Sequence, residues 1–138
     1  MTTLHHSPYT IITLSPDKRL LRAVWLPAAA QMEEQAVIHE ISQVLEAVAQ
    51  QGVKGILVDV RNYPFQNNER IQSWINFTYM PRIVESGVLF YALIVEKKRP
   101  SLYENTPDLD DVEEETQVEY FTDPAEAEQW LANKLAGK

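Results

Sequence analysis

The chain has 138 residues and a net charge of −8, with 45% hydrophobic residues, 23% charged residues and no cysteine. This balance is typical of a single soluble globular domain with a substantial core. It excludes a disulfide framework and a thiolate metal site, and no apolar run approaches the ~18 residues that a membrane-spanning helix needs. Because the N-terminus lacks the basic and apolar blocks of a signal peptide, the sequence predicts a cytoplasmic protein.

The negative charge is concentrated in one segment. Residues 104–119 hold eight of the 20 acidic residues and no basic residue, while the rest of the chain is close to neutral. Acidic surface repels nucleic-acid phosphates and anionic membranes, so nucleic-acid binding is not expected. The simplest interpretation is a solvated loop that the bases at 97–99 partly neutralise, and binding of a basic partner is the alternative.

The first predicted elements form an antiparallel hairpin. Residues 1–8 are expected to be a flexible tail outside the domain. Residues 9–14 and 20–25 are rich in β-branched and apolar side chains and predict two strands. The sequence Ser-Pro-Asp-Lys at 15–18 is a good type I turn between them.

Two helices flank a short apolar strand in the centre of the chain. The helix predicted over 28–51 carries an apolar stripe with the helical period. Residues 55–60 are nearly all apolar and predict a strand that is covered on both faces. The second helix should begin at Asn67 or Asn68, which are both good N-cap residues, and Pro81 should kink or interrupt it.

The C-terminal part adds two strands and a helix. Residues 88–95 are nearly all apolar and predict a strand parallel to the central one, because a helix connects the two. Residues 100–116 are expected to form a loop with a short helix around 108–115. Residues 117–121 alternate and predict a fifth strand, and Asp123 followed by a proline marks the start of a last helix.

Together these elements predict one α/β domain over residues 9–136, with a mixed five-stranded sheet that joins the N-terminal antiparallel hairpin to parallel βαβ units. Their order resembles that of the STAS-like domains, the fold of anti-sigma factor antagonists. The sequence is more closely similar to small bacterial STAS-like proteins of the Bacteroidetes type. The resemblance covers about residues 9–135 and is carried by four pieces in order: Trp25-Leu26-Pro27; Leu57-Val58-Asp59-Val60-Arg61-Asn62; Trp74 and Pro81 with Glu85-Ser86-Gly87-Val88; and Tyr120-Phe121-Thr122-Asp123 with Glu126-Ala127 and Trp130-Leu131.

The resemblance implies a binding or regulatory module rather than an enzyme. Anti-sigma antagonists of this fold carry a phosphorylatable Ser or Thr where the helix after the central strand begins. In this chain residues 61–68 contain neither, and the nearest hydroxyls are those of Tyr63 and Ser73. The phosphoswitch of that family is therefore not carried over. STAS-like sequences are also compared with lipid-transfer domains of the CRAL-TRIO type, but this chain is too short for their full lipid pocket.

Polar side chains follow the central strand, at the edge where open α/β sheets place ligands. Asp59 could act as a general base or as the partner of Arg61, and the alternative is a carboxylate that accepts backbone amides of the next turn. Asn67, Asn68 and Arg70 stand at the start of the second helix, where an anion could bind. The alternative there is an ordinary N-cap.

Two aromatic residues, Tyr63 and Phe65, flank a proline in the same loop. Exposed, they would suit a protein interface; alternatively, they fold back over the edge of the sheet. The three histidines, His5, His6 and His39, have no further ligand at metal-binding spacing, so neither a metal site nor a cofactor is expected.

Three functions follow as hypotheses. The first is a non-catalytic protein-binding or regulatory module that uses residues 59–68, with another protein as the partner; self-association is left open. The second is a carrier of a small apolar ligand or lipid, which a cavity lined by Trp74, Phe77, Tyr79 and Phe90 would favour. The third is an enzyme, which requires polar groups that converge near Asp59 and Arg61.

Overall fold

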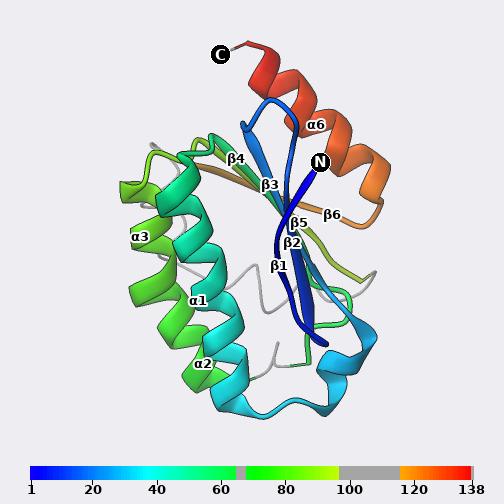
Figure 1. Ribbon diagram of the computed structural model, residues 1–138, viewed down its shortest axis with the longest axis vertical. Helices are drawn as coiled ribbons and strands as arrows, with labels where there is room; N and C mark the ends of the chain where they lie inside the picture. Colours follow the sequence, from blue (N-terminus) through cyan, green and yellow to red (C-terminus); the bar gives the residue numbers. More distant parts are fainter. Residues whose placement is uncertain (65–67, 97–115, 138) are drawn as a thin grey trace.

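A computed structural model describes residues 1–64, 68–96 and 116–137 of the chain. Six strands form one mixed sheet in the spatial order β1-β2-β3-β4-β5-β6 (Figure 1). The first three strands pair antiparallel, and from β3 onward each strand pairs parallel to the next. The strands are β1 (Thr2–His6), β2 (Thr10–Leu14), β3 (Leu20–Trp25), β4 (Gly55–Asp59), β5 (Phe90–Ile94) and β6 (Gln117–Phe121). The predicted mixed α/β sheet is confirmed, with parallel strands joined by helical crossovers after β3 and β4.

The N-terminal segment differs from the prediction. Thr2–His6 is an edge strand and not a tail, so the prediction of five strands was wrong by one. The ladder with β2 is irregular between Thr3 and His5. Such irregularities are common in edge strands, where they disfavour pairing with another chain. The strand was not predicted because the segment lacks apolar alternation. Contacts with residues far along the chain hold it in place.

Helices cover both faces of the sheet. The helices α1, α2 and α3 lie on one side, and α6 lies on the other (Figure 1). The 3₁₀-helix η1 contributes the buried Ala29 to the core under α1. Their bounds are η1 (Pro27–Gln31), α1 (Glu34–Gln51), α2 (Glu69–Trp74), α3 (Met80–Glu85) and α6 (Pro124–Ala136). The helix predicted over 28–51 is therefore divided: the chain leaves the 3₁₀-helix and enters α1 through Glu33, which is extended. Gly52 ends α1 in the left-handed conformation, with φ of 63°.

The predicted interruption at Pro81 takes the form of a π-helix. The π segment η2 (Ile75–Tyr79) joins α2 to α3, and the Met80 amide donates to the carbonyl of Ile75. Pro81 has no amide hydrogen to donate to the preceding turn, which favours a wider turn at this point. Turns of this kind are frequent at functional sites. Here the π segment supplies three residues to the cavity described below.

The sheet separates two hydrophobic cores. The larger core lies between the sheet and α1, α2 and α3, and the smaller core lies under α6. Central strand β4 is buried along its whole length, because Ile56 and Val58 face the larger core while Leu57 faces the smaller one. A side chain at Gly55 would lie 3.3 Å from Leu135 Cδ1, so glycine permits the close approach of α6.

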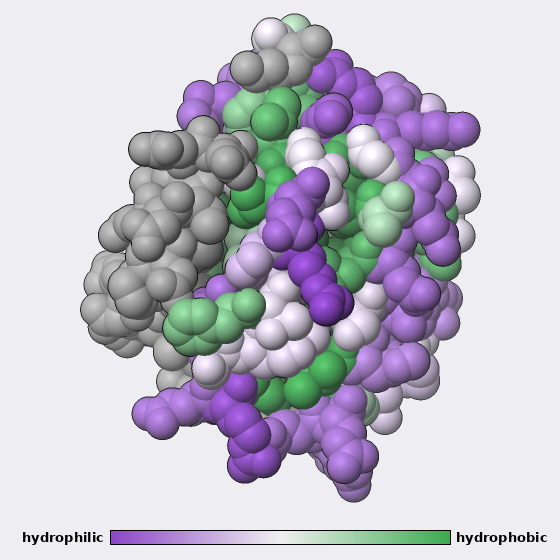
Figure 2. All heavy atoms as spheres, turned by 90° about the vertical axis from the view of Figure 1, so that its left-hand side faces the viewer, coloured by the Kyte–Doolittle hydropathy of each residue, from purple (hydrophilic) through white to green (hydrophobic). Residues whose placement is uncertain are grey.

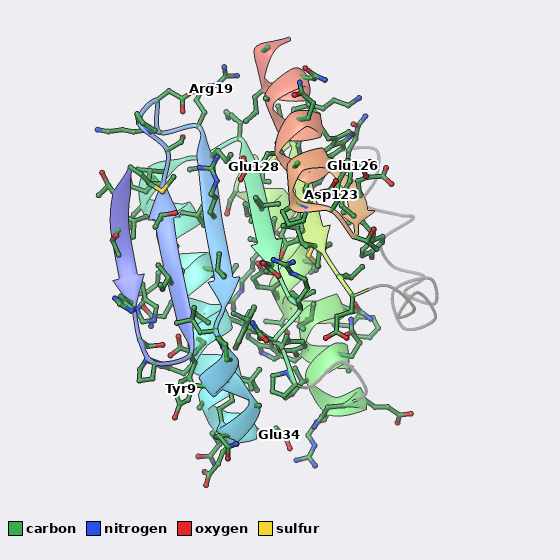
Figure 3. The ribbon with its side chains drawn as sticks, turned by 90° about the vertical axis from the view of Figure 1, so that its right-hand side faces the viewer. Tyr9, Arg19, Glu34, Asp123, Glu126 and Glu128 are labelled. Carbon is green, nitrogen blue, oxygen red and sulfur yellow. The ribbon has the colours of Figure 1, made fainter. Side chains whose placement is uncertain are left out.

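Helix α6 is held at both ends and in the middle. Asp123 Oδ1 caps its first turn by accepting from the Ala125 amide at 3.0 Å. Arg19 Nη2 donates to the Leu135 carbonyl at 2.7 Å near the other end. Between them, Arg22 on β3 makes two hydrogen bonds of 2.7 and 2.8 Å to Glu128 (Figure 3).

A buried carboxylate attaches β1 and the turn after it to α1. Glu40 is 5% exposed, and its Oε1 accepts hydrogen bonds from His5 Nε2 at 2.9 Å, from Ser7 Oγ at 2.9 Å and from Thr10 Oγ1. Burial by itself would raise the pKa of Glu40, but these hydrogen bonds together lower it below its ordinary value. The ionised side chain therefore joins residues that are 30 to 35 positions apart.

Candidate functional site

The carboxyl end of β4 carries an ion pair and not an open catalytic group. Asp59 is buried, and its Oδ1 accepts from the backbone amide of Arg61 at 3.1 Å and from Arg61 Nε at 2.9 Å. Its Oδ2 accepts from Arg61 Nη2 at 2.6 Å. The hydrogen bonds to the carboxylate raise the pKa of Arg61. Asp59 thus fixes the turn after the strand, while the Arg61 side chain stays 44% exposed.

Tyr63 folds back onto the sheet. It is 6% exposed and packs on Trp25 with ring centroids 5.0 Å apart, while its amide donates to the Val60 carbonyl at 3.1 Å. The interface role that required an exposed Tyr63 is therefore wrong for this residue, because apolar area on Trp25 is available to cover the ring. The predicted partner Phe65 and the candidate cap Asn67 lie outside the described residues.

The start of α2 has an ordinary cap. Asn68 Oδ1 accepts from the Ile71 amide at 3.0 Å, as the N-cap interpretation predicts. Arg70 is 84% exposed and lies 3.4 Å from Glu34 of α1, which makes it a surface ion pair. Of the predicted set, the structure brings Asp59 and Arg61 together, whereas Asn68 and Arg70 each contact other partners.

A cavity lies beside this junction, between the sheet and the α2–η2–α3 helix. Its volume is about 90 Å³. The strands contribute residues on the face of the larger core, and α1, α2, η2 and α3 contribute the facing side of the wall. The described lining residues are Trp25, Ile41, Val44, Val58, Val60, Tyr63, Gln72, Ile75, Asn76, Tyr79, Met80, Tyr91, Leu93, Val118 and Tyr120.

The lining is apolar and uncharged. Among the described residues that form it, five are aromatic, and the amide side chains are those of Gln72 and Asn76. Tyr79 is fully buried, its hydroxyl lies 2.8 Å from that of Tyr91, and burial raises the pKa of Tyr79, so the phenol stays neutral. The cavity therefore suits uncharged groups, which can pack against its walls. Its described lining offers no charged partner to a charged group.

The opening of the cavity is marked by half-buried residues. The partly exposed lining residues are Gln72, Ile75 and Asn76 on the helix, Leu93 on β5, and Val118 and Tyr120 on β6, whereas the other described lining residues are buried. Hydrophobic residues are also visible between hydrophilic ones on the side of the molecule that carries α1 to α3 (Figure 2).

Of the four residues whose cavity would favour a ligand carrier, the structure places Tyr79 in the lining. Trp74 stacks on Tyr79 with ring centroids 6.3 Å apart and is not among the described lining residues, and Phe77 is 68% exposed. Phe90 belongs to the core under α6, because alternate residues of β5 face opposite sides and Tyr91 takes the cavity side.

The same alternation is the signal that could have found the missed residues. Positions 58 and 60, 91 and 93, and 118 and 120 are alternate residues near the ends of three adjacent parallel strands. In a parallel sheet such positions meet on one face, so their pairing could have been read from the strand registers.

Other types of site find no support in the part of the chain that the structure describes. No group of three or more His, Asp or Glu side chains is placed to hold a metal ion among the residues described. Within the same ranges, no helix is both long enough and apolar enough to span a membrane.

Comparisons with protein-family models, with curated proteins and with solved structures found no match to this chain.

Proposed function

We propose that this chain is a non-catalytic, STAS-like regulatory domain that binds a small apolar ligand in the cavity beside the ends of β4, β5 and β6. The observation that carries the proposal is the cavity itself, which is apolar, aromatic and uncharged along its described lining. At β3 and β4 the lining reaches the carboxyl ends of the strands, with Trp25, Val58 and Val60, and open α/β sheets usually place ligands on this side.

The chemistry of the lining favours binding over catalysis. General acid–base catalysis needs a titratable group near neutral pH within reach of the substrate. The titratable groups among the described lining residues are tyrosines, and burial raises the pKa of Tyr79 still further from neutrality. Asp59, the nearest carboxylate of the predicted site, is held by three hydrogen bonds to Arg61.

A variant with a filled cavity tests the proposal. Val118 is half-buried at the opening, so Val118→Phe is expected to occupy the space and to weaken binding of toluene at least tenfold. An apolar cavity of about 150 Å³ binds benzene, so toluene tests whether this cavity of about 90 Å³ accepts a single aromatic ring. Binding is measured by titration of backbone amide NMR signals, where the wild type should respond at Val58, Val60 and Leu93.

Glu119→Phe is the matched control, since residue 119 is exposed and points to the other side of the same strand. It should bind toluene like the wild type. Two results would contradict the proposal. In the first, toluene shifts no amide NMR signals around the cavity of the wild type. In the second, the Val118→Phe variant binds toluene as tightly as the wild type.

A second candidate function is the protein-binding module, and the observation that favours it is Phe77. This residue is 68% exposed on η2, and large exposed aromatic residues often anchor protein interfaces. With a co-purified protein partner, Phe77→Ser is expected to weaken binding at least tenfold by biolayer interferometry. Ser73→Ala, at an exposed position one turn earlier, should leave the affinity unchanged, and equal binding by both variants would exclude Phe77 as the anchor.

A further inference from the structure

The amide side chains at the opening of the cavity suggest what its ligand carries. Gln72 Nε2 donates to Asn76 Oδ1 at 3.2 Å, across one turn where α2 meets the π segment. Both residues line the cavity and both are half-buried. They are thus the two polar side chains, apart from the tyrosines, that the described lining presents to an occupant.

The hydrogen bond between the two amides leaves them with unused capacity. A primary amide offers one carbonyl oxygen and two N–H donors, and the mutual bond uses one donor and one acceptor of the pair. The pair therefore keeps a carbonyl oxygen on one residue and an NH₂ group on the other. The same holds if the oxygen and nitrogen atoms of both amides are interchanged. In that case Gln72 keeps the NH₂ group and Asn76 keeps the carbonyl oxygen.

The charge of the lining limits the occupant further. An ionised group loses its hydration when it enters an apolar site, and without a paired charge this is strongly unfavourable. The described lining residues include no Lys, Arg, Asp or Glu. A ligand with a carboxylate or an ammonium group inside the cavity would therefore have no described partner there.

We propose that the cavity selects an uncharged aromatic compound that bears a carboxamide or lactam group, with the ring among the aromatic and aliphatic side chains and the amide on Gln72 and Asn76. A carboxamide supplies one donor and one acceptor side by side, which matches the acceptor and donor that the pair keeps. This inference rests on the proposed function, since it names the ligand class of the same cavity.

Three probes that share one phenyl ring separate the contributions. Toluene tests the apolar cavity alone, benzamide adds the neutral amide, and benzoate replaces that amide with a charge. In NMR titrations of the wild type, benzamide is expected to bind about tenfold more tightly than toluene and at least tenfold more tightly than benzoate.

Removal of the amide pair tests the assignment of residues. Gln72→Leu is expected to abolish the preference for benzamide over toluene while toluene still binds. Asn76→Leu, at the other half of the pair, should do the same and gives an independent variant if the first folds poorly. Ser73→Ala is the exposed control on the same helix and should keep the tenfold preference.

The outcomes distinguish this inference from the function on which it rests. If toluene fails to bind, the ligand-binding function fails. If toluene binds but benzamide binds no more tightly, or if both amide variants keep the preference, the cavity is an apolar site without amide recognition and the inference is overturned. Tighter binding of benzoate than of benzamide would also overturn it.

Discussion

Glu40→Ala is expected to lower the free energy of unfolding by about 2–4 kcal/mol. A hydrogen bond to an ionised group contributes more than a neutral one, and the loss of Glu40 leaves the buried Thr10 hydroxyl and two half-buried donors without this acceptor. Three side-chain donors converge on one oxygen of this carboxylate, from His5, Ser7 and Thr10. They belong to β1, to the turn after it and to β2, so the loss should also loosen the edge of the sheet. Urea denaturation followed by circular dichroism measures the change.

Glu46→Ala is the matched control for this prediction. Glu46 is an exposed residue of the same helix, and its replacement should change the free energy of unfolding by less than about 0.5 kcal/mol. Equal effects at the two positions would show that helix propensity, and not the buried hydrogen bonds, determines the loss.

The same carboxylate predicts a pH dependence of stability. The pKa of Glu40 in the folded state lies below its ordinary value of 4.5, so folding favours the ionised form. Its contribution is complete above pH 4.5 and is lost as the pH falls through the lower pKa of the folded protein. Glu40→Gln cannot titrate, so the difference in stability between wild type and this variant should shrink on acidification.

The central part of the fold could be predicted because its signals are local. Residues 55–60 are apolar enough to identify a strand covered on both faces, and the structure has β4 buried throughout. The cap at Asn68 follows from a side chain that accepts from an amide three residues away. Local patterns of this kind depend only on neighbours in the sequence, so they survive in the folded protein.

The edge strand and its anchor could not be predicted in this way. Thr2–His6 shows no apolar alternation, and Glu40 is a charged residue, for which a solvated position is expected although it lies on the buried face of α1. Each depends on the other, since His5 and Glu40 are hydrogen-bonded across 35 positions of the chain. A contact between two segments cannot be predicted when neither segment has a sequence pattern that indicates its burial.

The candidate site shows the same division. The sequence singled out the end of β4 from the position of Asp59, and Val58 and Val60 on either side of that residue line the cavity. It did not identify the cavity, because the register between adjacent strands decides which residues face it. Tyr91 and Phe90 are consecutive residues of similar character, yet one lines the cavity and the other packs under α6.

The core under α6 gives the second prediction with a large effect on stability. Leu131→Ala is expected to destabilise the fold by about 2–5 kcal/mol, because the side chain is fully buried and its removal leaves a cavity between α6 and the sheet. Leu131 lies against the start of β4: a Cβ atom at Gly55 would be in van der Waals contact with Leu131 Cδ2 at 3.5 Å. Urea denaturation measures the loss, and Asn133→Ala, an exposed change on α6, should stay within about 0.5 kcal/mol of the wild type.

The larger significance of Leu131→Ala lies in what it should leave unchanged. No described residue of the core under α6 lines the ligand cavity, which lies on the opposite face of the sheet. Toluene should therefore bind the folded fraction of the Leu131→Ala variant with the affinity of the wild type, in NMR titrations at a temperature where that variant stays folded. A marked loss of affinity would mean that packing under α6 determines the shape of the cavity through β4 and β5, and that the two faces of the sheet do not act independently.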